Sequence, residues 1–147
     1  MLEVGKKAHD FVANTQDGKI SLKQFRGKNV ILYFYPKDNT PGCTKEACNF
    51  RDNLPLLEKS GAVVIGVSKD SVDSHKEFAE KYKLNFHLVA DPDGEICKSY
   101  GADKGFGASA KRMTFIINKQ GKIAYVFPNV NPEHHSKEVL EFLKKMK

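Results

Sequence analysis

The sequence predicts an α/β protein in which a central mixed β-sheet is flanked by helices. Residues 30–35 and 62–68 are runs of β-forming residues without a charged side chain, a pattern typical of strands buried on both faces of a sheet. Apolar residues at helical spacing follow each run, and a hairpin pattern precedes the last helical segment. The order of strand, helix, strand, helix, strand, hairpin and helix predicts a mixed sheet with helices on both faces.

Length and composition indicate one domain, covering residues 1–147. A chain of 147 residues has room for a substantial core, and 40% hydrophobic with 29% charged residues is ordinary for a globular protein. We find no internal repeat, low-complexity segment or linker. No apolar run approaches membrane-spanning length, and the N-terminus lacks the apolar core of a secretory signal. If the chain is full length, we therefore expect a cytoplasmic protein with no membrane partner.

The elements are assigned in chain order from turn and capping signals. A short hairpin and one helical turn precede the first buried strand, at residues 10–13, 20–22 and 22–25. The helix after that strand begins after Thr40 or Thr44, and Pro55 is expected to break or kink it. Two strands alternating with two helices, two hairpin strands and a final helix follow, at residues 62–68, 72–82, 86–90, 96–100, 112–118, 123–127 and 133–146. Residues 101–110 are rich in Gly, Ala and Ser and are expected to form a mobile loop.

The net charge of +6 could suggest a nucleic-acid partner. The lysines are scattered along the sequence, however, and the last four residues hold the one evident cluster. A lysine-rich solvated surface explains this pattern, so we expect no nucleic-acid partner. Three cysteines are too few, and odd in number, for a disulfide framework. In a reducing compartment such cysteines more often perform chemistry, bind metal or pack in the core.

Cys43 lies where a buried strand leads into a helix. Pro36 ends the strand, a turn follows, and Thr40 or Thr44 can cap the helix. A helix N-terminus offers unpaired N–H groups and the positive end of the helix dipole, so a cysteine there should have a depressed pKa and be held as the nucleophilic thiolate. The alternative is a buried structural thiol. Glu46, in the first turns, is expected to pair with a lysine or to interact with the helix dipole.

Cys48 follows Cys43 by five positions on the same expected helix. In an ideal helix, two Cα atoms at this spacing are about 8 to 9 Å apart. A disulfide tolerates a Cα separation of no more than about 7 Å. The two cysteines can therefore form a disulfide only if the first turns of the helix unwind locally.

Residues 33–52 resemble the signature of the peroxiredoxins, and in particular that of the bacterioferritin-comigratory, or Q-type, subfamily. The family pattern of Pro, three residues, Thr, two residues and Cys is matched by Pro36, Thr40 and Cys43. The resolving cysteine that the subfamily carries five residues later is matched by Cys48. The specific motif is confined to this stretch, but the resemblance extends over essentially the whole chain and implies a thioredoxin-like fold.

This resemblance implies a cofactor-free thiol peroxidase that reduces hydrogen peroxide and small organic hydroperoxides. Cys43 would be the peroxidatic nucleophile, which becomes a sulfenic acid when it attacks the peroxide. The Thr40 hydroxyl and the backbone N–H groups of Gly42 and Cys43 would bind the peroxide. Arg112, which opens the strand after the loop, matches the active-site arginine of the family. Pro36 would shield the thiolate from water.

Several residues keep a second interpretation. Arg112 could be an exposed charge at a strand edge, and Lys111 beside it is a competing cation. Cys48 could be an inert thiol on the flank of the helix. As the resolving cysteine, it would instead condense with the sulfenic acid, and thioredoxin or a similar dithiol protein would reduce the Cys43–Cys48 disulfide. Cys97 lies outside the motif and is expected to pack as a small hydrophobic residue.

Other functions would need different features. A thiol–disulfide oxidoreductase acting on proteins would more naturally carry Cys-x-x-Cys, which is absent from the sequence. A redox-dependent chaperone or nucleic-acid binding module is a further alternative, which salt-sensitive DNA binding would support. A Cys2His2 metal site built from Cys43, Cys48 and the pair His134-His135 fits no finger spacing, so we expect no metal. Chains of the resembling subfamily are often monomeric, and we expect a monomer here.

Overall fold

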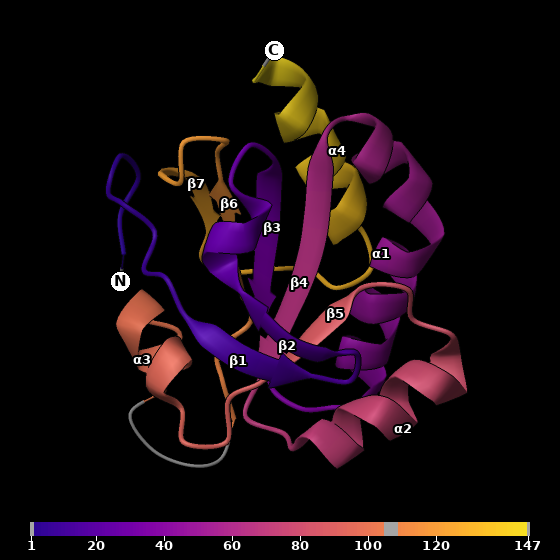
Figure 1. Cartoon of the computed structure of the whole chain (residues 1–147). Helices are drawn as coiled ribbons and strands as arrows, with labels where there is room; N and C mark the ends of the chain where they lie inside the picture. Colours follow the sequence, from indigo (N-terminus) through magenta and orange to yellow (C-terminus); the bar gives the residue numbers. More distant parts are fainter. Residues whose placement is uncertain (1, 105–108, 147) are drawn as a thin grey trace.

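Strand β3 (Asn29–Phe34) lies inside the sheet and leads directly into the stretch that carries the cysteine motif. The computed structural model describes residues 2–104 and 109–146, and in this part of the chain seven strands form one sheet in the order β2-β1-β5-β4-β3-β6-β7 (Figure 1). The other strands are β1 (Val12–Thr15), β2 (Gly18–Ser21), β4 (Ala62–Ser68), β5 (His87–Ala90), β6 (Met113–Ile117) and β7 (Ile123–Phe127).

The strand directions confirm the expected mixed sheet. Strands β3, β4 and β5 run parallel to one another, whereas β6 is antiparallel to both β3 and β7. The N-terminal hairpin of β1 and β2 extends the sheet beyond β5 by antiparallel pairing. Because β3 and β4 are parallel, the chain has to cross over between them, and helix α1 (Pro41–Lys59) makes this crossover.

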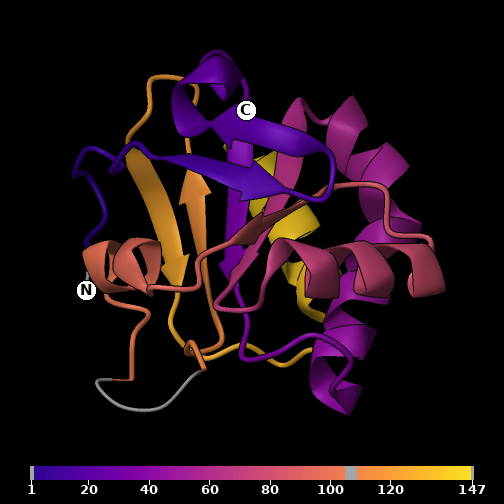
Figure 2. The same cartoon turned by 60° about the horizontal axis from the view of Figure 1, so that its bottom comes forward.

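Alternate residues of β3 face two separate cores, as the two-residue period of a strand requires. Val30, Leu32 and Phe34 belong to one core, whereas Ile31 and Tyr33 belong to the other. The first core is covered by α3 and the 3-10 turn η1, and the second by α1, α2 and α4; Figure 2 shows α3 and α1 on opposite sides of the molecule. These helical elements are η1 (Leu22–Phe25), α2 (Val72–Tyr82), α3 (Glu95–Tyr100) and α4 (His135–Lys145).

Helix α1 differs from its expected form, because Pro55 lies inside it and the helix continues to Lys59. Of the expected break or kink at Pro55, the break was therefore wrong. A proline removes one backbone N–H from the helix, but Leu54 and Leu57 on either side of Pro55 are buried and hold this turn against the core.

The other expected elements are present, with ends that differ by one or two residues. Residues 105–108, inside the expected mobile loop, lie outside the described residues, and an isolated β-bridge between Asp103 and Ala110 joins the two flanks of the loop. Among the described helices, none has the length and apolar character needed to cross a bilayer.

We predict that Gly66→Ala destabilises the fold, because Gly66 lies in the middle of the sheet under two large side chains. A Cβ at this position would lie 2.9 Å from Cζ of Tyr33 and 3.0 Å from Cδ2 of Leu88, closer than real Cβ atoms approach. Overpacking of this kind costs about 1–3 kcal/mol. Urea unfolding of the reduced protein should show the loss, whereas an unchanged midpoint would mean that the Tyr33 ring moves aside without cost.

Candidate active site

Cys43 is the third residue of α1, which follows β3 after a short connection of residues 35–40. Pro41 occupies the first helical position, and Thr40 is the N-cap residue. The first helical hydrogen bond joins the Thr44 N–H to the Thr40 carbonyl, so the N–H groups of Gly42 and Cys43 precede it and are not used by the helix. Cys43 is only 1% exposed. The side chain therefore lies at the positive end of a helix, as the sequence predicted, and it is shielded from water.

Arg112 contacts Cys43 directly. Its Nη2 donates a hydrogen bond to Cys43 Sγ at 3.3 Å, and its Nη1 donates to Glu46 Oε1 at 2.7 Å. Arg112 directly precedes β6, whose first residue, Met113, pairs with the last residue of β3, so the sheet itself brings the arginine to the start of α1. Of the two candidate cations, Arg112 thus lies against Cys43, while Lys111 is exposed.

Gly42 leaves space for this close approach. A Cβ on Gly42 would lie 3.1 Å from Nη2 of Arg112, and Cγ of Pro132 is 3.8 Å from the same point. The start of α1 is therefore enclosed by the segment entering β6 and by the segment between β7 and α4, which come together near the bottom of Figure 2. The absence of a side chain at Gly42 leaves the guanidinium room beside Cys43.

Glu46 is fully buried and pairs with Arg112, so the expected lysine partner or helix-dipole role was wrong. Its Oε2, and the hydroxyl of Tyr33, have no hydrogen-bond partner among the described residues. Burial raises the pKa of Glu46 from 4.5 to about 7, although the positive charge of Arg112 acts in the opposite direction. The sequence did contain a signal for the burial of Glu46. Residues three apart share a helix face, so an inward-facing Cys43 predicts that Glu46 also faces inward.

Thr40 and Pro36 lie at the entrance to the helix. The Thr40 hydroxyl donates to the carbonyl of Lys37 at 2.9 Å, and the helix start has no side-chain cap among the described residues. Thr40 therefore occupies the predicted cap position without making the capping bond. Pro36 is half-buried and follows the buried Tyr35. Both residues lie in the short connection that sets the position of Cys43.

Asp38 anchors this connection from inside. Its carboxylate accepts hydrogen bonds from the Tyr35 hydroxyl at 2.6 Å and the Ser74 hydroxyl at 2.8 Å, and contacts His75 Nδ1 at 2.7 Å. His75 Nε2 donates to the carbonyl of Val89 at 2.9 Å, since a carbonyl oxygen can only accept. The loop before α1 is thereby tied to α2 and β5, through contacts that no local sequence pattern reveals.

The same group has the ligand types of a metal site. One ligand atom from each of Asp38, Asp70 and His75 lies within 4.8 Å of the others. These atoms already make hydrogen bonds within the protein. Asp70 accepts from the Ser68 hydroxyl at 2.6 Å and from the Asp38 N–H at 2.9 Å. The geometry therefore supports a structural anchor for the active-site loop.

The three cysteines are free thiols in different surroundings. Cys48 is half-buried and lies on α1, five residues after Cys43. Because both residues are helical, their Cα atoms are too far apart for a disulfide in this structure. Cys97 is fully buried in the core on the opposite side of the sheet from Cys43. Burial raises the pKa of the Cys97 thiol well above its usual value, and the neighbouring Asp91 raises it further. Cys97 is packed in the core, as expected from the sequence.

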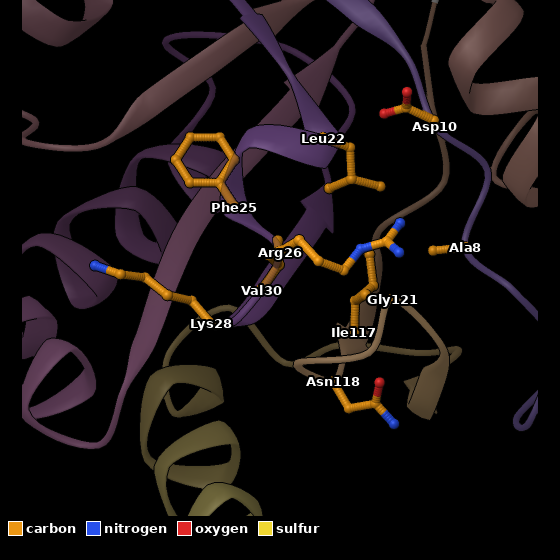
Figure 3. A pocket seen from close by; sticks show the side chains of 10 residues that line it. All are labelled: Ala8, Asp10, Leu22, Phe25, Arg26, Lys28, Val30, Ile117, Asn118 and Gly121. Atoms are coloured by element: carbon orange, nitrogen blue, oxygen red, sulfur yellow. The ribbon is translucent and has the colours of Figure 1, made fainter.

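A separate cavity lies at the other end of β3. Its walls include Val30, near the beginning of that strand, and Ile117, at the end of β6, while the guanidinium of Arg26 crosses above Gly121 (Figure 3). Cys43 follows the opposite end of β3. This cavity is therefore not part of the cysteine site.

Comparisons with known proteins identify the family of the chain. The AhpC/TSA family pattern matches residues 4–126. A putative peroxiredoxin bcp of Coxiella burnetii is 50% identical over 146 residues, which cover 95% of this chain and 97% of the relative. The chloroplastic peroxiredoxin Q of Oryza sativa subsp. japonica is 43% identical over 145 residues, 97% of this chain and 67% of the relative.

Solved structures show the same fold. The peroxidoxin BcpB of Mycobacterium tuberculosis has a TM-score of 0.94 at 30% identity and covers 100% of this chain and 99% of its own. The bacterioferritin comigratory protein of Xanthomonas campestris, described with an alkyl peroxide reduction activity, has a TM-score of 0.89 at 33% identity, with 99% and 98% covered. The predicted thioredoxin-like fold is thereby confirmed.

We predict that Glu46 makes the protein less stable as the pH rises. A carboxyl whose pKa is higher in the folded than in the unfolded state favours folding at low pH, and this contribution is lost as the pH rises from about 4.5 to about 7. The Glu46 contribution between pH 5 and pH 8 should be about 2 to 3 kcal/mol, because each pKa unit corresponds to about 1.4 kcal/mol. Burial lowers the pKa of His135 to about 4, which changes the stability in the opposite direction, so urea unfolding measures the Glu46 contribution as the difference between wild type and Glu46→Gln.

The variant Glu46→Gln should abolish this part of the pH dependence while keeping an oxygen for Arg112. Glu58→Gln, on an exposed position of the same helix, is the matched control. A Glu46→Gln protein that loses as much stability as wild type between pH 5 and pH 8 would contradict the prediction.

Proposed function

The chain belongs to the AhpC/TSA family and is a thiol peroxidase of the peroxiredoxin type, and we propose that Cys43 and Cys48 are its two reacting cysteines. The observation that carries the assignment is the hydrogen bond from Arg112 to Cys43 Sγ at the buried start of α1. A guanidinium beside the sulfur is a donor for the negative charge that moves during attack on a peroxide.

In the first step, the Cys43 thiolate attacks one oxygen of the peroxide. An S–O bond forms and the O–O bond breaks, so the sulfur is oxidised to a sulfenic acid and the departing oxygen leaves as hydroxide or alkoxide, which takes up a proton. Charge moves from sulfur to the departing oxygen, and fixed donors along that line lower the barrier. Arg112 and the N–H groups of Gly42 and Cys43 are donors at this helix start, the Thr40 hydroxyl joins them once it releases the Lys37 carbonyl, and Pro36 limits access of water.

In the second step, the thiol of Cys48 condenses with the Cys43 sulfenic acid and releases water. The helical spacing of the two cysteines forbids a disulfide while α1 is intact, so the first turns of α1 must unwind. A dithiol protein then reduces the disulfide and returns α1 to its helical form. Thioredoxin is the reductant that we propose.

Substrate and setting are also proposals. The Xanthomonas campestris relative is described with alkyl peroxide reduction, which supports small organic hydroperoxides beside hydrogen peroxide as substrates here. The Coxiella burnetii relative is bacterial, which supports a cytoplasmic location, although the plant relatives are chloroplastic. We propose that the protein acts as a monomer.

A short peroxide challenge tests the cysteine assignment. Reduced wild-type protein should form the Cys43–Cys48 disulfide within seconds of adding one equivalent of hydrogen peroxide, with Cys97 left for alkylation and mapping by mass spectrometry. Cys43→Ser should abolish turnover. Cys48→Ser should complete the first step and then accumulate the sulfinic acid of Cys43 in excess peroxide, because no resolving thiol is present.

Cys97→Ala is the matched control, and it should turn over like wild type. Three alkylated thiols in challenged wild-type protein would overturn the peroxidatic role of Cys43. Normal recycling of Cys48→Ser with thioredoxin would show that Cys48 is not needed for resolution.

We predict that Arg112→Met slows the reaction of Cys43 with peroxide by about 100-fold or more, the usual cost of losing one donor to the transition state. Stopped-flow kinetics of the first step measures the rate. Lys111→Met, at the neighbouring exposed position, should change the rate little. The double variant Arg112→Met/Glu46→Gln avoids an unpaired buried carboxylate and should be as slow as the single one. A larger loss for Lys111→Met would identify the other cation as the catalytic one.

A further inference from the structure

Asn49 joins the helix that carries both cysteines to the last helix of the protein. It follows Cys48 directly and is half-buried on α1. Its Nδ2 donates to the carbonyl of Glu133 at 3.1 Å, and its Oδ1 accepts from the N–H of Ser136 at 3.2 Å and from the Ser136 hydroxyl. All three bonds connect positions more than eighty residues apart in the sequence.

Asn49 acts as the cap of helix α4. The N-cap residue of α4, His134, makes no side-chain cap hydrogen bond among the described residues. Ser136, in the first turn of α4, is fully buried, so its N–H needs a protein partner. Asn49 provides this partner from another helix, and an asparagine oxygen is among the preferred acceptors at such a position.

A second contact closes the same junction. Lys45 pairs with Glu133 at 3.0 Å, one turn before Asn49 on α1. Both side chains are more than half exposed, so this ion pair adds little by itself. The contacts of Lys45 and Asn49 lie within or next to the 43–48 segment, which has to leave the helical form for the disulfide. Unwinding this segment therefore works against the junction between α1 and α4.

We propose that Asn49 is a positioning residue for the second half of the reaction, in that its contacts with Glu133 and Ser136 hold α1 helical and set how fast the Cys43–Cys48 disulfide forms. The proposal rests on the assignment of Cys43 and Cys48 above. While α1 is helical, Cys43 is held beside Arg112 for the first step, and Cys48 cannot reach it.

The sulfenic acid of Cys43 then has two competing fates. In one, Cys48 gives a disulfide and one water molecule. In the other, a second peroxide transfers an oxygen to the sulfenic acid, which becomes a sulfinic acid, and the peroxide leaves as water or an alcohol. The first fate requires unwinding of α1 and the second does not. The junction at Asn49 consequently controls the ratio of the two products.

The junction also connects the redox state to α4. Once the segment that ends next to Asn49 is unwound, the Asn49 side chain no longer caps Ser136. The first turn of α4 then has an unpaired buried N–H, which favours local opening. The disulfide form should therefore show faster amide hydrogen exchange around residues 134–138 as well as around 43–50.

The test compares Asn49→Ala with Asn53→Ala. Nδ2 of Asn53 donates to Ser136 Oγ and to the backbone carbonyl of Asn49, each at 2.9 Å, but Asn53 lies one turn further along α1, beyond the segment that must unwind. Reduced protein is mixed with peroxide and quenched at successive times, and mass spectrometry follows the disulfide and the sulfinic acid of Cys43. Asn49→Ala should form the disulfide about fivefold faster, the effect expected for the loss of one net hydrogen bond from the helical form.

The other readouts follow from the same scheme. Asn49→Ala should need about fivefold more peroxide for the same sulfinic fraction, and should leave the rate of the first step unchanged. Asn53→Ala should lower the unfolding midpoint without changing the product ratio. Glu133→Ala, which removes only the exposed ion pair, should change the ratio in the same direction by a smaller factor.

An unchanged product ratio in Asn49→Ala, or an equal change in Asn53→Ala, would overturn the proposal, and either result would leave the assignment of the cysteines intact. Failure of wild-type protein to form the Cys43–Cys48 disulfide would instead overturn that assignment. Unchanged hydrogen exchange at residues 134–138 in the disulfide form would show that α4 keeps its cap and that the junction does not open.

Discussion

The contact between Arg112 and Cys43 determines how the rest of the site is built. An arginine can reach the start of α1 because β6 pairs with β3 in antiparallel register, so the residue before one strand lies beside the residues after the other. Gly42 leaves room for the guanidinium, and the buried carboxylate of Glu46 fixes its orientation. The hydrogen bond from Arg112 to Cys43 therefore depends on the sheet topology, on the absence of a side chain at Gly42 and on the buried Glu46.

This arrangement has a cost in stability. Glu46 is fully buried, and the hydrogen-bonding capacity of its Oε2 is unused among the described residues. Removing a charged pair from water costs several kcal/mol per ion, which good pairing only partly returns. The raised pKa of Glu46 reflects this unfavourable burial. A protein selected for stability alone would place an apolar residue there, so the pair is better explained by the orientation of Arg112.

Local patterns of the sequence were enough to predict the strands, most helices and the position of Cys43, because uncharged β-forming runs and a turn before a helix are local signals. Contacts between distant positions were not predictable from local patterns, and only the family resemblance placed Arg112 in the site of Cys43. The pairing of Asp38 with His75, of Glu46 with Arg112 and of Asn49 with Ser136 joins residues 37, 66 and 87 positions apart. The break expected at Pro55 is absent for a related reason, since burial of the flanking leucines outweighs the tendency of proline to interrupt a helix.

Helix α1 has to satisfy two opposing demands, and its sequence divides them between its halves. The second half buries Phe50, Leu54 and Leu57 and is anchored by large apolar side chains. The first half buries the small residues Cys43 and Ala47 together with Glu46, so unwinding it exposes little apolar surface and returns a carboxylate to water. The burial of Glu46 thus favours opening of the first turns, while the Asn49 junction opposes it. The same residues that prepare Cys43 for peroxide also make the helix around it easy to unwind once sulfur is oxidised.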